Sequence, residues 1–353
     1  MNTKKLIGML IALVVVIGII VVSNQIANQK PGEKEVKFFP AFEQSKCAAF
    51  LIEDKDNAVK IRRKGDIWIV VDPQDQTGGD KPLLQEPRKT KDESSKEYPA
   101  DSAAVYTALD KIELMEKAML SSTKPEKQEK YQVDTANGIR LTVWGENSKK
   151  LGSVIIGKNA ANQTSHFVRE VGSNNVYTTP GSVRYSFFSD PGRWRDKSIV
   201  KFNKSLVKKL AIDKQGSRYA MEKTLDTASN PVWSLVEPEK APANNDEVKR
   251  IVDEFARFNC TDWENNDTLS DSAMGFTAPE MTITATLENG DKKTAVIGQK
   301  KGDTNKFWVK TPGKDAIFLA NDWVIEKFDK NLEDLKAEEE EPKGATPVSS
   351  SEE

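Results

Sequence analysis

The stretch from Trp68 to Pro73 reads W-I-V-V-D-P, and the stretch from Trp233 to Pro238 reads W-S-L-V-E-P. Further blocks match at shifts that stay constant within a block and change only between blocks, as a duplication with loop insertions predicts. The matched pairs are Phe42/Phe202 and Ile52/Ile212 at a shift of 160, Asp101/Asn244, Leu109/Val252 and Ile112/Phe255 at 143, and Gly157/Gly298, Phe167/Trp308, Tyr177/Phe318 and Phe187/Phe328 at 141. Chance matching of aromatic positions is the alternative, but four collinear blocks argue against it. The chain therefore contains two copies of one domain.

Each copy has the pattern of antiparallel strands, a helix, more antiparallel strands and a short closing helix. Short apolar or alternating runs separated by charged or glycine-containing turns predict antiparallel meanders. Asp101 and Asn244 each precede a stretch with apolar residues on one helical face, which is typical of a capped helix lying on a sheet. The expected fold class is α+β: an N-terminal transmembrane helix followed by two duplicated domains of antiparallel sheet with packed helices.

The amino-terminal region predicts a membrane anchor. Residues 6–22 are uninterrupted apolar residues or glycine, close to the length that spans a bilayer as a helix. Lys4 and Lys5 precede them and no charge follows until Lys30, so the positive-inside rule places the amino terminus inside. A cleaved secretory signal is the alternative, which Val22-Ser23-Asn24 fits poorly. Either way we expect the body to be extracytoplasmic, held at the inner or cytoplasmic membrane by one pass.

These patterns divide the chain into seven segments, of which the last has a composition that cannot bury a core. They are a cytoplasmic stub at 1–5, the anchor at 6–22, a linker at 23–41, the first repeat at 42–188, a connector at 189–201, the second repeat at 202–329 and an acidic, Ser- and Pro-containing disordered tail at 330–353. The sequence leaves the role of the tail open. It also leaves open whether Cys47 and Cys260 are paired, although two buried free thiols are favoured.

The usual residues of enzymatic and metal sites are sparse. The single histidine, His166, falls on an expected strand, and its counterpart in the second copy is Phe307. Gly152 to Asn159 nearly matches a phosphate-binding loop, but Asn159 lacks the required hydroxyl and the segment reads as a strand. The 54 carboxylates leave an envelope hydrolase open without nominating a pair. A net charge of −2 argues against nucleic acid. We expect no enzyme, no cofactor, no metal and no catalytic residue.

The connector holds the most unusual surface sequence of the chain. Arg193, Trp194 and Arg195 follow Pro191-Gly192, and arginine and tryptophan are typical anchors of binding surfaces. Either these three residues contact a protein partner, or Trp194 packs between the two repeats while the arginines pair with carboxylates. The second interpretation is favoured.

The stretch from Phe38 to about Phe328 resembles a bacterial family known as domain of unknown function 4340. The resemblance is carried by Phe39-Pro40, Ala100-Asp101, Ile156-Gly157-Lys158, Val176-Tyr177 and the run W-R-D-K-S-I from Trp194 to Ile199. It implies an accessory protein of gliding-motility-type ABC exporters and carries no activity. The long loop at 74–98 and the charged tail depart from the family pattern. The leading hypothesis is a non-enzymatic membrane accessory protein of such a transport complex, with protein partners; the alternative is a cell-envelope module that binds glycan or peptide.

Overall fold

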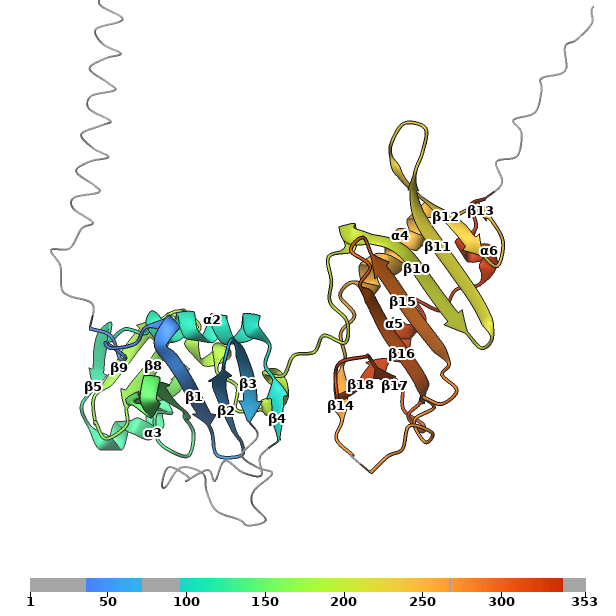
Figure 1. Ribbon diagram of the computed structural model, residues 1–353. Helices are drawn as coiled ribbons and strands as arrows, with labels where there is room; N and C mark the ends of the chain where they lie inside the picture. Colours follow the sequence, from blue (N-terminus) through green and yellow to red (C-terminus); the bar gives the residue numbers. More distant parts are fainter. Residues whose placement is uncertain (1–35, 72–95, 267, 339–353) are drawn as a thin grey trace, which may run out of the picture. The chain divides into compact units, whose positions relative to one another are not determined.

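The computed structural model describes residues 36–71, 96–266 and 268–338. The chain separates into two compact units, Met1–Asp196 and Lys197–Glu353, each built around one nine-stranded antiparallel sheet (Figure 1).

The first unit runs its strands in the spatial order β4-β3-β2-β1-β6-β7-β8-β9-β5. The strands are β1 (Cys47–Glu53), β2 (Ala58–Lys64), β3 (Ile67–Val71), β4 (Glu97–Pro99), β5 (Met119–Ser122), β6 (Ile139–Gly145), β7 (Lys150–Asn159), β8 (Ser165–Glu170) and β9 (Val176–Pro180). The helices are α2 (Ser102–Glu113) and α3 (Gln128–Tyr131), with 3-10 turns η1 (Gln44–Lys46), η3 (Pro125–Lys127), η4 (Glu146–Ser148), η5 (Val183–Ser186) and η6 (Pro191–Arg193).

The second unit repeats this topology strand for strand, in the order β13-β12-β11-β10-β15-β16-β17-β18-β14. Its strands are β10 (Val207–Lys214), β11 (Ser217–Leu225), β12 (Pro231–Glu237), β13 (Ala241–Pro242), β14 (Asp262–Glu264), β15 (Met281–Leu287), β16 (Lys292–Lys300), β17 (Lys306–Lys310) and β18 (Ile317–Asn321). Its helices are α4 (Asn245–Phe255), α5 (Asp322–Ile325), α6 (Leu332–Leu335) and the 3-10 turn η7 (Lys204–Leu206). Trp68 on β3 and Trp233 on β12 occupy equivalent strands. The predicted duplication is confirmed.

The expected fold class, α+β behind a transmembrane helix, is wrong. Two nine-stranded antiparallel sheets dominate the described residues, and helices are few. The closing helices expected near Phe187 and Phe328 are only single turns, η5 and α5. The residues just before them belong to the meander, as strands β9 and β18. Residues 6–22 lie outside the described residues, and none of the helices that the structure does describe is long and apolar enough to cross a membrane.

Each unit packs one long helix against one face of its sheet. Asp101 caps α2 by accepting hydrogen bonds from the Ala103 and Ala104 N–H groups, at 2.9 and 3.3 Å. Asn244 caps α4 by accepting one from the Glu247 N–H at 3.2 Å. The main cores combine these helices with the inner faces of the sheets. Since strand side chains alternate, the next residues face the other way and form a smaller cluster on the opposite face of each sheet.

Gly157 and Gly298, one of the matched pairs of the sequence, have a steric explanation. A Cβ at Gly157 would clash with the backbone oxygen of Tyr131, and a Cβ at Gly298 would clash with that of Met274. In both units a covering segment passes directly over β7 or β16, so only glycine fits.

Two short segments, which we call the leading strap and the closing strap, bind the ends of each unit to its own body. The leading straps are residues 36–38 and 197–199. Lys117 N–H donates to Val36 O at 2.7 Å, and Cys260 N–H donates to Lys197 O at 2.8 Å. The closing straps are residues 194–196 and 335–337, which accept hydrogen bonds from the helix caps: Asp101 N–H to Trp194 O at 2.7 Å, and Asn244 N–H to Leu335 O at 2.9 Å.

The straps place the repeat boundary between Asp196 and Lys197. Within the expected connector at 189–201, residues 194–196 are the closing strap of the first unit and residues 197–199 are the leading strap of the second, with no residue between them. The second unit also extends beyond its expected end at 329, because α6 and the closing strap use residues 332–337, which the sequence assigned to a disordered tail.

Candidate functional site

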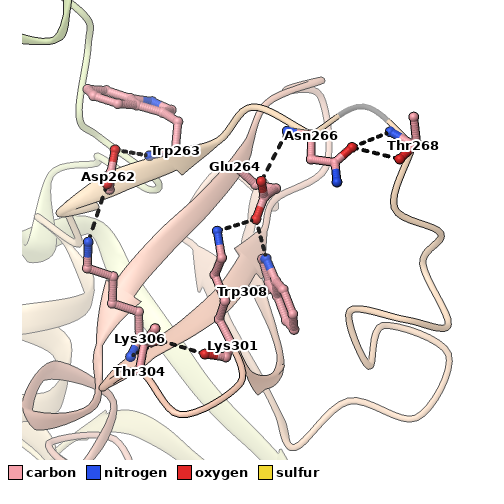
Figure 2. Close-up of polar contacts among 9 residues, drawn as sticks. All are labelled: Asp262, Trp263, Glu264, Asn266, Thr268, Lys301, Thr304, Lys306 and Trp308. Carbon is pink, nitrogen blue, oxygen red and sulfur yellow. Dashed lines mark hydrogen bonds and ion pairs between the residues drawn. The ribbon is translucent and has the colours of Figure 1, made fainter.

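A polar cluster surrounds Glu264 on the edge strand β14 (Figure 2). Lys301 Nζ and Trp308 Nε1 both donate to Glu264 Oε2, at 2.7 and 3.0 Å. The Asn266 N–H donates to Oε1 at 3.0 Å. The Glu264 side chain is only 8% exposed. Its carboxylate thus joins β14 to the ends of β16 and β17 and to the loop that follows.

The electrostatics of this cluster fit a structural latch and not acid–base chemistry. Burial raises the pKa of the Glu264 carboxyl, but hydrogen bonds from Lys301, Trp308 and Asn266 outweigh that effect and lower the pKa to about 2. A general acid or base needs a pKa near the working pH and a free oxygen to accept or deliver a proton. Glu264 stays ionised at neutral pH with both oxygens engaged.

The rest of the cluster offers no ligand set for a metal. Asp262 accepts from Lys306 Nζ at 3.3 Å, so its charge is also matched. Across the part of the chain that the structure describes, no group of three or more His, Cys, Asp or Glu side chains could hold a metal ion.

The first unit has nothing like this cluster at the equivalent position. The pairing of each edge strand with its neighbour aligns Asp262 and Trp263 of β14 with Met119 and Leu120 of β5, and aligns Glu264 with Ser122 across a bulge at Ser121. One edge strand is therefore charged and latched, whereas its counterpart is uncharged. The sequence could have shown this difference only after the two edge strands had been aligned.

Arg193, Trp194 and Arg195 were expected to contact a partner or the other repeat. Trp194 is instead a core residue of the first unit. It is 2% exposed and its ring meets that of Phe50 edge-on at 5.5 Å. Its Nε1 donates to Phe188 O at 2.8 Å. The indole therefore packs within its own unit. The same position in the second unit is the buried Leu335.

The two neighbouring arginines differ from each other. Arg195 is 8% exposed, and its guanidinium lies 3.6 Å from the centre of the Tyr98 ring. Arg193 is exposed, with its guanidinium 4.8 Å from the centre of the Phe188 ring. Both cations stack on aromatic rings of the first unit. A partner contact by Arg193 stays a prediction.

His166 is buried on β8, opposite Thr179. Its Nδ1 lies 3.2 Å from Gly181 O, and its ring meets that of Tyr185 edge-on at 5.5 Å. Burial lowers its pKa. The near-match to a phosphate-binding loop at 152–159 lies on strand β7, as the sequence favoured. Cys47 and Cys260 are both buried and are not joined in a disulfide, and burial raises the pKa of the Cys47 thiol to about 12.

A family model described as a domain of unknown function (DUF4340) matches residues 93–273 and again residues 233–340. The chain belongs to this DUF4340 family. The two matches begin at positions separated by nearly the repeat shift, and the first match crosses the boundary between the two units. No curated protein matches the chain.

Proposed function

We propose that this DUF4340 protein is a non-enzymatic accessory of a membrane transport complex of the ABC-exporter kind, and that its first unit binds a protein partner. The family resemblance supplies the transport context, and the extracytoplasmic location stays a prediction because residues 1–35 lie outside the described residues.

The observation that carries the proposal is an asymmetry between two units of identical topology. Among the described residues, nine large apolar side chains are exposed in the first unit and three in the second. Those of the first are Val36, Ile67, Tyr106, Leu114, Met119, Leu120, Val171, Tyr185 and Phe188, and those of the second are Leu206, Leu225 and Trp323. Contiguous exposed apolar surface is typical of a protein-binding face, and the first unit has more exposed apolar side chains from which such a face can be built.

The non-enzymatic part of the proposal rests on how the reactive groups are used. Glu264 is held ionised by three donors, and His166 is buried with its Nδ1 beside a backbone carbonyl. Both side chains hold structure together in the unit to which they belong. The sequence leaves open that the protein binds a peptide. A peptide would use the same exposed apolar side chains of the first unit, because it is also a protein segment.

Site-specific photo-crosslinking in native membranes tests the proposal. We expect a photoreactive residue at Tyr106 or Tyr185 of the full chain to capture a discrete membrane-protein partner. Leu225 and Trp323 are matched controls, since they are the most exposed apolar residues of the second unit. Capture from the second unit alone, or equal capture from both, would contradict a binding role for the first unit.

A further inference from the structure

The helix α2 carries a second stripe of small and apolar residues, on the side that faces away from its core. We call it the outer stripe; its members recur at helical spacing and are Ala103, Tyr106, Thr107, Asp110 and Leu114, all exposed. Tyr106 is 50% exposed, and Leu114, the C-cap of the helix, is 65% exposed. The Thr107 hydroxyl donates to Ala103 O at 2.9 Å, so the helix itself satisfies that polar group. Asp110 is the one charged member of the outer stripe.

The second unit has charged residues at all five of these positions. At the shift of 143, the counterparts of the outer stripe are Asp246, Lys249, Arg250, Asp253 and Arg257 on or just after α4. The buried sides of α2 and α4 match each other, with apolar residues at equivalent positions in both cores. A helix on the surface of a soluble protein normally carries polar or charged residues opposite its core. Since α4 follows this rule in the same fold, the outer stripe of α2 is not needed for folding.

The charge beside the outer stripe is unmatched. Gln44 Nε2 donates to Asp110 Oδ1 at 2.6 Å and to Glu113 Oε2 at 2.8 Å. At the shift of 160 the counterpart of Gln44 is Lys204, whose Nζ lies 2.8 Å from Asp253 Oδ2. The second unit therefore neutralises the carboxylate that the first unit bonds only to a neutral amide. Among the described residues, neither Asp110 nor Glu113 has an ion-pair partner.

The turn beside α2 shows the same difference between the units. The turn η5 contacts α2, and Tyr185 within it is 60% exposed. Phe188, two residues after η5, is 38% exposed. Their counterparts at the shift of 141 are Glu326 and Asp329, and Asp329 forms an ion pair with Lys214. Apolar side chains thus stand in place of charges both on α2 and on the turn next to it.

We infer that the outer stripe of α2 binds one amphipathic helix of a partner protein, with a basic residue of that helix beside Asp110 and Glu113. This inference rests on the proposed binding role of the first unit. Exposed residues at spacings of three and four are the pattern through which helices pack on one another, and the small Ala103 and Thr107 let a second helix approach closely. From Ala103 to Leu114 the outer stripe is about 17 Å long, which matches about three turns of a partner helix.

The unmatched charge argues for such a helix and against the other occupants of this surface. A two-fold contact with a second copy uses the same surface on both subunits, so it would double the negative charge in the interface without adding a matching cation on α2 beside it. A membrane surface with anionic lipids would be repelled by the same two carboxylates. A basic amphipathic helix is complementary to both the apolar and the acidic residues of α2.

Photo-crosslinking within the outer stripe, using the full-length chain in native membranes, tests the inference. A photoreactive residue replaces Thr107, in the middle of the stripe, and mass spectrometry identifies the crosslinked peptide. We expect a peptide from another protein that has apolar residues at helical spacing and at least one Lys or Arg. The matched control places the photoreactive residue at Arg250, the counterpart on α4, and should capture at most about a tenth as much.

Variants of the same photoreactive chain test each part of the interface. Tyr106→Lys and Leu114→Arg introduce the residues of α4 and should each lower capture about tenfold or more, whereas Tyr106→Phe keeps the ring and should retain it. Glu113→Gln should lower capture several-fold and weaken its dependence on salt. Ile67→Lys, at a residue 56% exposed on β3, is the control and should capture normally. Thermal melts of all variants confirm that they fold.

Several results would overturn the inference. A crosslinked peptide from residues 1–35 or 72–95 would make this chain its own occupant, and a peptide from α2 of an isotope-labelled second copy would make a dimer the occupant. A lipid adduct, a partner peptide without a basic residue, or capture that Tyr106→Lys leaves unchanged would each contradict it as well. If position 107 captures nothing while a photoreactive residue at Tyr185 still captures a partner, the binding role of the first unit survives and only the helix-binding stripe falls. Silence at both positions would contradict both.

Discussion

Replacing Trp194 tests whether its part of the predicted connector, residues 194–196, belongs to the first unit alone. Its indole is 2% exposed, contacts the Phe50 ring at 5.5 Å and donates to Phe188 O at 2.8 Å. Truncation of a buried tryptophan to alanine costs about 3 to 5 kcal/mol. Trp194→Leu, which introduces the residue found at the equivalent position of the second unit, keeps an apolar side chain there and should cost about half as much.

Hydrogen exchange followed by mass spectrometry reads the two units separately, because peptides from each unit are measured on their own and, as two compact units, we expect each to open in its own cooperative transition. A loss of about 4 kcal/mol raises exchange through global opening by roughly a factor of 10³. We expect this acceleration in α2 and the inner strands β1 and β6 for Trp194→Ala, and a smaller one for Trp194→Leu. Peptides from residues 197–337 should exchange at their natural rate in both variants.

Two outcomes would refute the reasoning. Faster exchange in both units would show that Trp194 couples the repeats, as an inter-repeat wedge would. Unchanged exchange in both units would show that the indole does not lie in the core of the first unit.

Three further predictions concern the repeated elements and the two perturbed groups. Gly157→Ala and Gly298→Ala should each destabilise their own unit by about 1 to 3 kcal/mol or more in denaturant unfolding, because the added Cβ meets a backbone carbonyl; a neutral effect at either site would contradict the steric account. Glu264 has a folded pKa of about 2, below its usual 4.5. Its contribution to the stability of the second unit is therefore present above pH 4.5 and is lost as the pH falls through about 2. Glu264→Gln should remove this part of the pH dependence in acid titrations of unfolding. His166 has a folded pKa below 6.5, so the first unit should lose stability as the pH falls from 6.5 through the folded pKa. His166→Phe introduces the residue of the second unit; this variant should fold normally and show a weaker dependence of stability on pH. An unchanged pH dependence would mean that His166 is not the titrating group.

The sequence predicted the features that local pattern controls. The cap and apolar stripe of α2 recur in α4, so both helices could be placed from Asp101 and Asn244 onward. The matched glycines were visible as a pair, although their cause, a carbonyl lying over each strand, appears only in the structure. Residues 152–159 lie on strand β7, as predicted, because the short apolar run at 154–156 is typical of a buried strand and not of a phosphate-binding loop.

The sequence could not predict the straps or the fold class. Each strap makes backbone hydrogen bonds to residues far away in the chain, and backbone bonds leave no requirement on side-chain type. Trp194 and Leu335 are therefore equivalent without resembling each other. For the same reason the short strands β4, β5, β13 and β14, which complete the sheets, have little pattern of their own, and the α+β expectation underestimated the sheet.

The candidate sites were hidden for a related reason. Glu264 is one of 54 acidic residues, and only folding brings Lys301 and Trp308 to its carboxylate. The exposed side chain of Met119 becomes informative only beside its charged counterpart Asp262, and that comparison needs the strand alignment of the two units.

The central claim is that two units of one topology have divided their roles, with the first binding a partner through its exposed apolar side chains, Met119 among them. The most direct test places a photoreactive residue at Met119 or at its counterpart Asp262 in the full-length chain and crosslinks native membranes. The account predicts that a partner is captured from position 119 and not from position 262. Equal capture at the two positions, or capture from 262 alone, would contradict it.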